Sequence, residues 1–239
     1  MPHTMADTAV VLLSGGMDSA TALAMTIKEG HDVIGLTFDY GQRHRKEIEA
    51  AARIAKHFRV VDHRVLAIDL SPIGGSALTD PRIRVPEQRR IEEIGRGIPI
   101  TYVPARNTIL LAYALGLAEA TAARSIVIAA NQIDYSGYPD CRPEYYAAFR
   151  EVARLGTKRG VEGDVVEIRT PLIRMSKADI IRKGAELGVP WELTWSCYLG
   201  GSQACGVCDS CQLRLKGFHE AGLKDPLSYA SPGRHPANA

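Results

Sequence analysis

Four cysteines near the end of this chain have the residue type and spacing of a metal site. Cys197, Cys205, Cys208 and Cys211 lie within fifteen positions, and their short gaps let thiolates converge on one ion, with Gly206 easing the turn. Four soft ligands with no open position predict one structural Zn2+. An iron–sulfur cluster is an alternative, because C-x2-C-x2-C resembles a ferredoxin pattern. Unliganded reduced thiols are a third possibility.

The turn Leu13-Ser14-Gly15-Gly16-Met17-Asp18-Ser19 has the composition of a phosphate-binding loop. Its two glycines allow positive φ and close approach to an anion, and amides at a helix start would face a phosphate together with the serine hydroxyls. Asp18 suits a site where a divalent cation accompanies the phosphate. The sequence fits neither the Walker pattern nor G-x-G-x-x-G. A plain tight turn is the alternative, but the position after a buried strand favours ligand binding.

Three polar strings, at residues 39–44, 102–107 and 131–142, are expected at the same sheet edge as the glycine turn. They combine aromatic rings, amides, carboxylates and guanidinium groups. Such a set suits a planar, purine-like ring, which needs stacking faces and hydrogen bonds along its edges. Solvated polar loops are the simpler interpretation of each string taken alone.

Buried apolar runs alternate with helical patterns along most of the chain. This alternation predicts an α/β fold with a doubly wound parallel sheet and helices on both faces, similar to a Rossmann fold. Ser176 and Asp179 have the spacing of a capping box, and Gly188 and Pro190 would end that helix. We expect strands at 8–13, 32–38, 60–68, 125–130 and 165–169, and helices at 18–29, 46–58, 105–124, 144–155 and 176–187.

We expect a nucleotide-binding domain at 8–175 and a small helical, zinc-binding lobe at 176–226. We expect residues 1–7 and 227–239 to be flexible tails, and residues 71–99 to be a long loop of the kind that forms lids or is disordered.

The composition, 46% hydrophobic and 23% charged, is that of a globular protein, and the net charge of +2 gives no broad basic field for nucleic acid. No apolar run approaches membrane-spanning length, and no signal peptide is visible. We therefore expect a cytoplasmic protein without membrane or nucleic-acid partners.

The ordered motifs Ser-Gly-Gly-Met-Asp-Ser, Asp-Tyr-Gly-Gln-Arg-His, Val-Pro-Ala-Arg-Asn, Asp-Tyr-Ser-Gly-Tyr-Pro-Asp-Cys-Arg-Pro-Glu, Thr-Pro-Leu, Thr-Trp-Ser-Cys-Tyr and Cys-Gly-x-Cys-Asp-Ser-Cys resemble the 7-cyano-7-deazaguanine synthase family. That family belongs to the PP-loop, or adenine-nucleotide α-hydrolase, superfamily. The resemblance covers residues 9–226. The sequence departs from the family pattern at Ala105 and Ala130, where we expect glycine, so that the loop conformation is in doubt at both places.

The resemblance implies an ATP-dependent ligase that turns 7-carboxy-7-deazaguanine and ammonia into the nitrile through an amide, with Mg2+ accompanying ATP. Activation would release either AMP and pyrophosphate or ADP and phosphate. A homodimer is also implied. The catalytic residues that the resemblance implies are Asp18, Arg43, Arg106 and Lys177, of which the three cations would stabilise negative charge on the phosphate or leaving group. The residues expected to contact ATP are Leu13, Ser14, Gly15, Gly16, Met17, Asp18, Ser19, Ala20, Thr21, Ala22 and Leu23. The residues expected to contact the substrate are Gln42, His44, Asn107, Asn131, Asp134, Tyr135, Tyr138 and Asp140.

Two other functions compete with this interpretation. A tRNA-modifying PP-loop enzyme would need a persulfide-carrying cysteine, for which Cys141 is the sole spare residue, and a basic tRNA-binding face. We interpret Cys141 as a small buried residue or pocket wall rather than a nucleophile. A zinc-ribbon binding module with a degenerate nucleotide fold is the other alternative, and the intact Ser-Gly-Gly-x-Asp-Ser string disfavours it.

Overall fold

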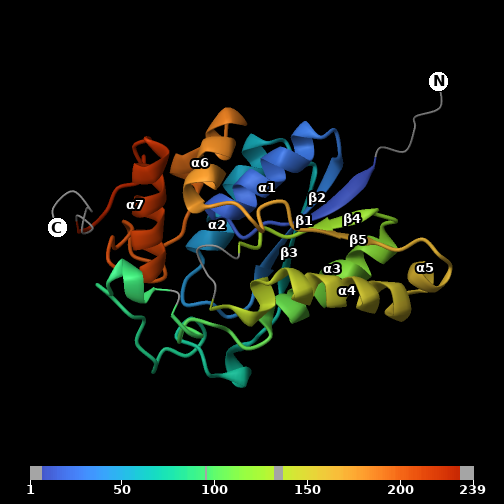
Figure 1. Ribbon diagram of the computed structural model, residues 1–239, viewed down its shortest axis with the longest axis horizontal. Helices are drawn as coiled ribbons and strands as arrows, with labels where there is room; N and C mark the ends of the chain where they lie inside the picture. Colours follow the sequence, from blue (N-terminus) through green and yellow to red (C-terminus); the bar gives the residue numbers. More distant parts are fainter. Residues whose placement is uncertain (1–6, 95, 132–136, 232–239) are drawn as a thin grey trace.

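The computed structural model describes residues 7–94, 96–131 and 137–231. A five-stranded, entirely parallel sheet in the order β3-β2-β1-β4-β5 runs through the middle of the molecule (Figure 1). The chain therefore starts at the central strand, crosses to one edge, and then returns to build the other half. The strands are β1 (Thr8–Leu12), β2 (Asp32–Asp39), β3 (Asp62–Ala67), β4 (Ser125–Val127) and β5 (Glu167–Arg169).

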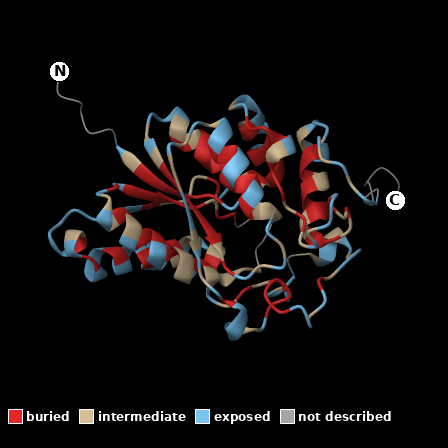
Figure 2. Cartoon of the chain, turned by 180° about the vertical axis from the view of Figure 1, so that it is seen from behind, coloured by how far each residue is buried: buried red, intermediate tan, exposed pale blue. Residues whose placement is uncertain are grey.

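Side chains alternate across β1 and separate the core into two layers. Val10 and Leu12 pack in one apolar cluster with the helices α3 (Arg106–Ala120) and α4 (Pro143–Gly156). Val11 packs on the other face with α1 (Met17–Lys28), α2 (Lys46–His57) and α6 (Lys177–Glu186). Burying both faces of a parallel sheet requires this two-layer cover. The doubly wound fold expected from the sequence is confirmed, and Figure 2 shows the buried strands between the two helix layers.

Observed elements differ from the expected ones mainly at strand ends. The strands expected at 60–68, 125–130 and 165–169 are shorter, because residues beyond the ladders turn away to form loops. The capping box at the start of α6 is present, since the Ser176 hydroxyl accepts from the amide of Asp179, and Asp179 accepts from the amide of Ser176, both over 3.2 Å. The helix α5 (Lys158–Val161) is a single short turn.

The C-terminal part is built around α7 (Asp209–Ala221), which packs beside α6. Gly217 makes this packing possible, because a Cβ there would collide with the side chain of Lys177. Gly184 likewise admits the ring of Trp191. Short 3-10 turns occur at Ser71–Ile73, Ile91–Glu93, Pro139–Cys141 and Trp191–Leu193. Because α6 also shares an apolar cluster with α1, the boundary proposed at residue 175 lies within a continuous core.

Two segments are more ordered than expected. In the loop at 71–99, Ser76 and Ala77 are fully buried, and Glu87 forms an antiparallel bridge with Cys208. Within the segment expected to be a flexible tail, Tyr229 bridges Ala204 and its hydroxyl donates to Asp225 over 2.5 Å. Backbone pairing at both places satisfies polar groups that a free loop would leave to water. No helix in the described ranges is long and apolar enough to cross a bilayer.

Candidate functional site

The glycine turn joins β1 to α1 and is braced by its own serines. The Ser14 amide and hydroxyl donate to Ser19 Oγ over 3.2 and 3.1 Å, and Ser19 Oγ donates to the Gly16 carbonyl over 3.0 Å. Gly15 adopts φ +84°, a conformation that favours glycine. Gly16 precedes α1 and supplies no side-chain cap, so that the first amides of a twelve-residue helix face the site. The turn therefore presents hydroxyls and a helix N-terminus to an anion.

Lys177, the first residue of α6, forms an ion pair with Asp18 in the first turn of α1. Its Nζ lies 2.8 Å from Asp18 Oδ1 and 2.7 Å from Oδ2. The lysine side chain is 7% exposed and the aspartate 25%. Both residues line the cavity described below, so α6 brings a cationic side chain to the glycine turn.

Arg106 enters the site from the first turn of α3. Its guanidinium carbon lies 5.8 Å from the centre of the Tyr40 ring. The pKa of Tyr40 rises to about 12, mainly through burial, so that this ring stays neutral at physiological pH. Next to Arg106, the backbone amide of Asn107 donates to Asp140 Oδ2 over 3.2 Å. Ala105, which caps α3, has φ +52° and ψ +20°, the left-handed conformation that a glycine would adopt without strain.

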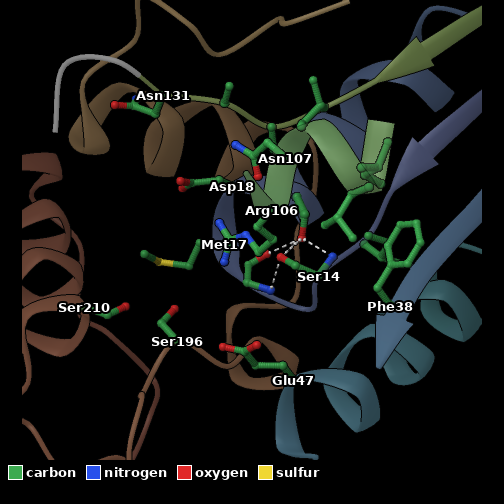
Figure 3. Close-up of a pocket in the computed structure, with 18 of the residues that line it drawn as sticks. Ser14, Met17, Asp18, Phe38, Glu47, Arg106, Asn107, Asn131, Ser196 and Ser210 are labelled. Carbon is green, nitrogen blue, oxygen red and sulfur yellow. Dashed lines mark hydrogen bonds between the residues drawn. The ribbon is translucent and has the colours of Figure 1, made fainter. Parts of the chain in front are cut away.

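One cavity of about 280 Å3 collects these groups where β1, β2 and β4 end. Figure 3 shows Ser14, Asp18 and Arg106 around it, with Asn107 and Asn131 on the side of Asp18. Of the residues predicted from the sequence, its walls contain Leu13, Ser14, Gly16, Met17, Asp18, Ser19, Gln42, Arg106, Asn107, Asn131, Tyr138 and Lys177. Apolar side chains such as Leu36 and Phe38 complete it. This mixture of apolar walls with converging polar groups is typical of small-molecule sites.

The C-terminal lobe forms part of the cavity wall. Ser196 and Tyr198, which flank Cys197, line it, and so does Ser210, which precedes Cys211. The four cysteine sulfurs lie within 4.8 Å of one another, and backbone amides donate to two of them, as from Cys205 to Cys197 Sγ over 3.3 Å. None of these cysteines forms a disulfide. The cluster could hold a metal ion directly beside the cavity.

Several residues predicted from the sequence do not reach the cavity. The Arg43 guanidinium instead donates to the carbonyls of Ala77, Asp80 and Ile83, and so fastens the long loop. His44 packs edge-on against Trp195 with 6.4 Å between ring centres. The other residues that do not line the cavity are Gly15, Ala20, Thr21, Ala22, Leu23 and Asp140.

These residues have structural contacts of their own. Ala20, Thr21, Ala22 and Leu23 are buried within α1, directly after the glycine turn. Asp140 stands behind Asn107, and its pKa is raised, chiefly by burial. Asp134 and Tyr135, also predicted to contact the substrate, lie outside the described residues.

Glu47 lines the cavity from the first turn of α2 and was not among the residues predicted from the sequence. Burial is the main cause that raises its pKa to about 7, with Cys197 adding to the rise and Arg106 opposing it. One signal was available in the sequence. Glu47 precedes Ala51 and Ile54 by four and seven positions, so a charged residue stands on the buried face of an amphipathic helix.

Cys141 forms part of the cavity wall as a protonated thiol. Burial and the neighbouring Asp140 raise its pKa to about 12. The Asn107 side-chain amide lies 3.6 Å from its sulfur. A thiol with this pKa is a poor nucleophile at neutral pH, because the thiolate is the reactive form.

Comparison with known proteins matches residues 8–222 to the family described as queuosine biosynthesis protein QueC. Among curated relatives, the 7-cyano-7-deazaguanine synthase of Thermosynechococcus vestitus is 59% identical over 93% of this chain and 95% of its own length. That of Nostoc punctiforme is 56% identical over 93% of this chain and 99% of its own length. That of Stutzerimonas stutzeri is also 56% identical, over 92% of this chain and 97% of its own length.

Among solved structures, the chain is similar in fold to a 4-thiouridine synthetase in a complex with RNA and bound ATP. The TM-score is 0.50 at 19% identity, over 97% of this chain and 48% of the other. An NMN synthetase from Francisella tularensis has a TM-score of 0.49 at 16% identity, over 92% of this chain and 79% of the other.

Proposed function

This chain belongs to the queuosine biosynthesis protein QueC family, and we propose that it is the ATP-dependent ligase that converts 7-carboxy-7-deazaguanine and ammonia into 7-cyano-7-deazaguanine. One observation supports this most. A single cavity joins the phosphate-type loop of β1 and α1 to two cationic side chains, Arg106 and Lys177. A reaction that must activate a carboxylate with ATP needs this combination of anion-binding groups.

The chemistry explains why ATP is required. A carboxylate at neutral pH is a poor electrophile, and its oxygen is a poor leaving group. Transfer of an adenylyl or phosphoryl group to that oxygen corrects both, after which ammonia displaces the activated oxygen and gives the amide. A second activation at the amide oxygen then permits loss of that oxygen as the nitrile forms.

We assign the parts of the loop by their contacts. Ser14, Gly16 and Ser19 would hold ATP phosphates through hydroxyls and helix-start amides. Asp18 has the oxygen ligands suited to Mg2+, which would neutralise phosphate charge. Lys177 already pairs with Asp18, and we propose that it turns towards the phosphates when the cation arrives.

One part of the cavity wall carries side chains suited to a deazaguanine ring. We propose that Tyr138, Asn107 and Asn131 contact its face and edges, with Asp134 and Tyr135 retained from the family resemblance. Arg106, next to the Tyr40 ring, is placed to stabilise charge on the activated carboxyl group. Arg43 is left out of this set, because its guanidinium is bound to backbone carbonyls.

We propose that the four-cysteine cluster binds one structural Zn2+. Its sulfurs are close enough for one ion, and backbone amides orient them. The metal would hold the lobe that carries Ser196, Tyr198 and Ser210 against the cavity. No reaction step is assigned to it.

The tRNA-modifying alternative finds little support, because it needs a reactive thiolate and Cys141 is held protonated. A homodimer and the lack of a nucleic-acid partner stay predictions. Light scattering of the purified protein tests the first, and a tRNA-binding titration at low salt tests the second.

The decisive experiment incubates purified protein with 7-carboxy-7-deazaguanine, ammonium and Mg-ATP, and identifies products by chromatography and mass. The nitrile is the expected product, and AMP or ADP identifies the activation route. Folded, zinc-loaded protein that forms no nitrile would overturn the proposal. Accumulation of the amide alone would show that the second activation does not occur.

A further inference from the structure

Glu47 lines the cavity wall, and its carboxylate forms no hydrogen bond or ion pair with the residues to which a role was assigned above. Within the described residues, its side chain has neither a hydrogen-bond donor nor an ion-pair partner. Figure 3 shows it with Ser196 on one side of the Ser14 loop, and Asp18 and Asn131 on the other. It therefore occupies a separate part of the cavity from the Asp18–Lys177 pair.

The backbone of Glu47 lies directly against the glycine turn. Gly15 lies so close to α2 that a Cβ on it would collide with the Glu47 carbonyl. The cationic neighbours of Glu47 in the sequence are both used elsewhere. Lys46 Nζ donates to the Ser202 carbonyl over 3.1 Å and lies over Trp195, while Arg45 pairs with Asp39 at 3.3 Å.

An unpaired carboxylate in such a place is costly to the folded protein. Burial raises its pKa, whereas Arg106 and the first-turn position on α2 favour the ionised form. Tyr40 also faces it, as a neutral phenol. A small cation bound at this point would offset the desolvation cost.

We propose that Glu47 binds the ammonium ion that supplies the nitrogen of the product. The inference rests on the proposed function, which requires ammonia, a species present at neutral pH mainly as its cation. The carboxylate substrate is excluded from this position by like charge. Mg2+ prefers several oxygen ligands and phosphate, and Asp18 provides for it on the other side of the loop. Ser196, at the same wall, offers ammonium a neutral acceptor.

The proton balance follows from this placement. Ammonium gives one proton to the Glu47 carboxylate, and the nitrogen lone pair then attacks the activated carboxyl carbon. The bond from that carbon to the activated oxygen breaks, its electron pair leaves with the nucleotide or phosphate, and the second N–H proton goes to that leaving group. The neutral amide remains, and Glu47 returns its proton to water through the cavity.

The test separates the two halves of the reaction. Glu47→Gln keeps size and removes charge, and Glu49→Gln on the exposed face of α2 is the matched control. With 7-carboxy-7-deazaguanine, Glu47→Gln should raise the KM for ammonium by roughly 10- to 100-fold, as expected when a hydrogen bond to a charged group is lost. The KM for ATP should stay within about twofold. With the amide supplied in place of the acid, nitrile formation needs no ammonium and should proceed within about twofold of wild type.

A binding readout independent of activity completes the test. Ammonium chloride should raise the melting temperature of the wild-type protein and of Glu49→Gln above that in sodium chloride, and it should not do so for Glu47→Gln. Glu47→Asp, which keeps the charge, should recover part of the ammonium affinity. Equal loss of both half-reactions, an unchanged KM for ammonium, or no ammonium-specific shift in wild type would overturn the inference. Failure of wild type to form nitrile from either substrate would instead overturn the proposed function.

Discussion

The ammonium nitrogen of Lys177 lies 2.7 and 2.8 Å from the two carboxylate oxygens of Asp18, although 159 positions separate the residues in the chain. The pair joins the first turn of α6 to the first turn of α1, next to the glycine turn. One contact thus links the C-terminal helices to the proposed nucleotide site.

Replacing Lys177 tests this link. Lys177→Met should lower the free energy of unfolding by about 1–2 kcal/mol, since a partly buried carboxylate loses its partner. It should also weaken ATP binding by roughly 10- to 100-fold through loss of a charge-assisted contact. Urea unfolding and calorimetric titration measure the two effects. In the control Lys183→Met, an exposed pair with Glu186 is lost, and the cost should be about 0–0.5 kcal/mol. Wild-type ATP affinity in Lys177→Met would contradict the assignment.

Ala105 offers a test in which stability should increase. Its left-handed φ of +52° costs alanine roughly 1 kcal/mol relative to glycine. Ala105→Gly should therefore raise the urea midpoint, by a net gain of about 0.5 kcal/mol after the entropy of the more flexible unfolded chain is subtracted. Ala112→Gly, inside α3, should lower stability by about 0.5–1 kcal/mol. A destabilising Ala105→Gly would show that the backbone at this cap is unstrained.

The cysteine cluster predicts one zinc per chain, measured by elemental analysis. Chelation, or Cys208→Ser, should lower the melting temperature by roughly 2–4 °C for every kcal/mol of lost stability. Cys141→Ser, outside the cluster, should keep the full metal content. Brown protein with iron and sulfide would support the iron–sulfur alternative, and loss of zinc without any thermal effect would rule out a structural role.

Glu47 predicts a stability that depends on pH. Its pKa of about 7 in the folded protein exceeds the ordinary 4.5, so the folded state holds this proton more tightly than the unfolded state. Its contribution is therefore favourable at low pH and is lost as the pH rises from 4.5 to 7. Glu47→Gln should be more stable than wild type at pH 8, by about 1–2 kcal/mol after allowance for solvent in the cavity. At pH 4.5 the two should unfold together. Equal stability at pH 8 would mean that the carboxylate is well solvated.

The parallel sheet could be predicted because its evidence is local. Apolar runs such as the one at β1, each followed by a turn and a helix, need no knowledge of distant contacts. The glycine turn was located for the same reason, and so was the cysteine cluster. Strand ends were less certain, because ladder length depends on the neighbouring strand rather than on composition.

Individual site residues were harder to predict, because a loop position does not determine the direction of a side chain. Arg43 and Gln42 are adjacent in the sequence, yet only Gln42 lines the cavity, while Arg43 reaches backbone carbonyls more than thirty positions away. Glu47 was missed because its significance depends on tertiary structure: it is a half-buried carboxylate on the cavity wall, with no hydrogen bond or ion pair to its side chain within the described chain.

Cys197 has Ser196 and Tyr198 as its immediate neighbours, and both side chains belong to the cavity wall. If zinc and ATP bind as proposed, any coupling between these two sites that share a wall is reciprocal. Whatever factor zinc adds to the affinity for ATP, bound ATP must add to the affinity for zinc. By that factor, a chain with bound ATP and a chain without it would differ in the zinc concentration at which the cysteine cluster fills.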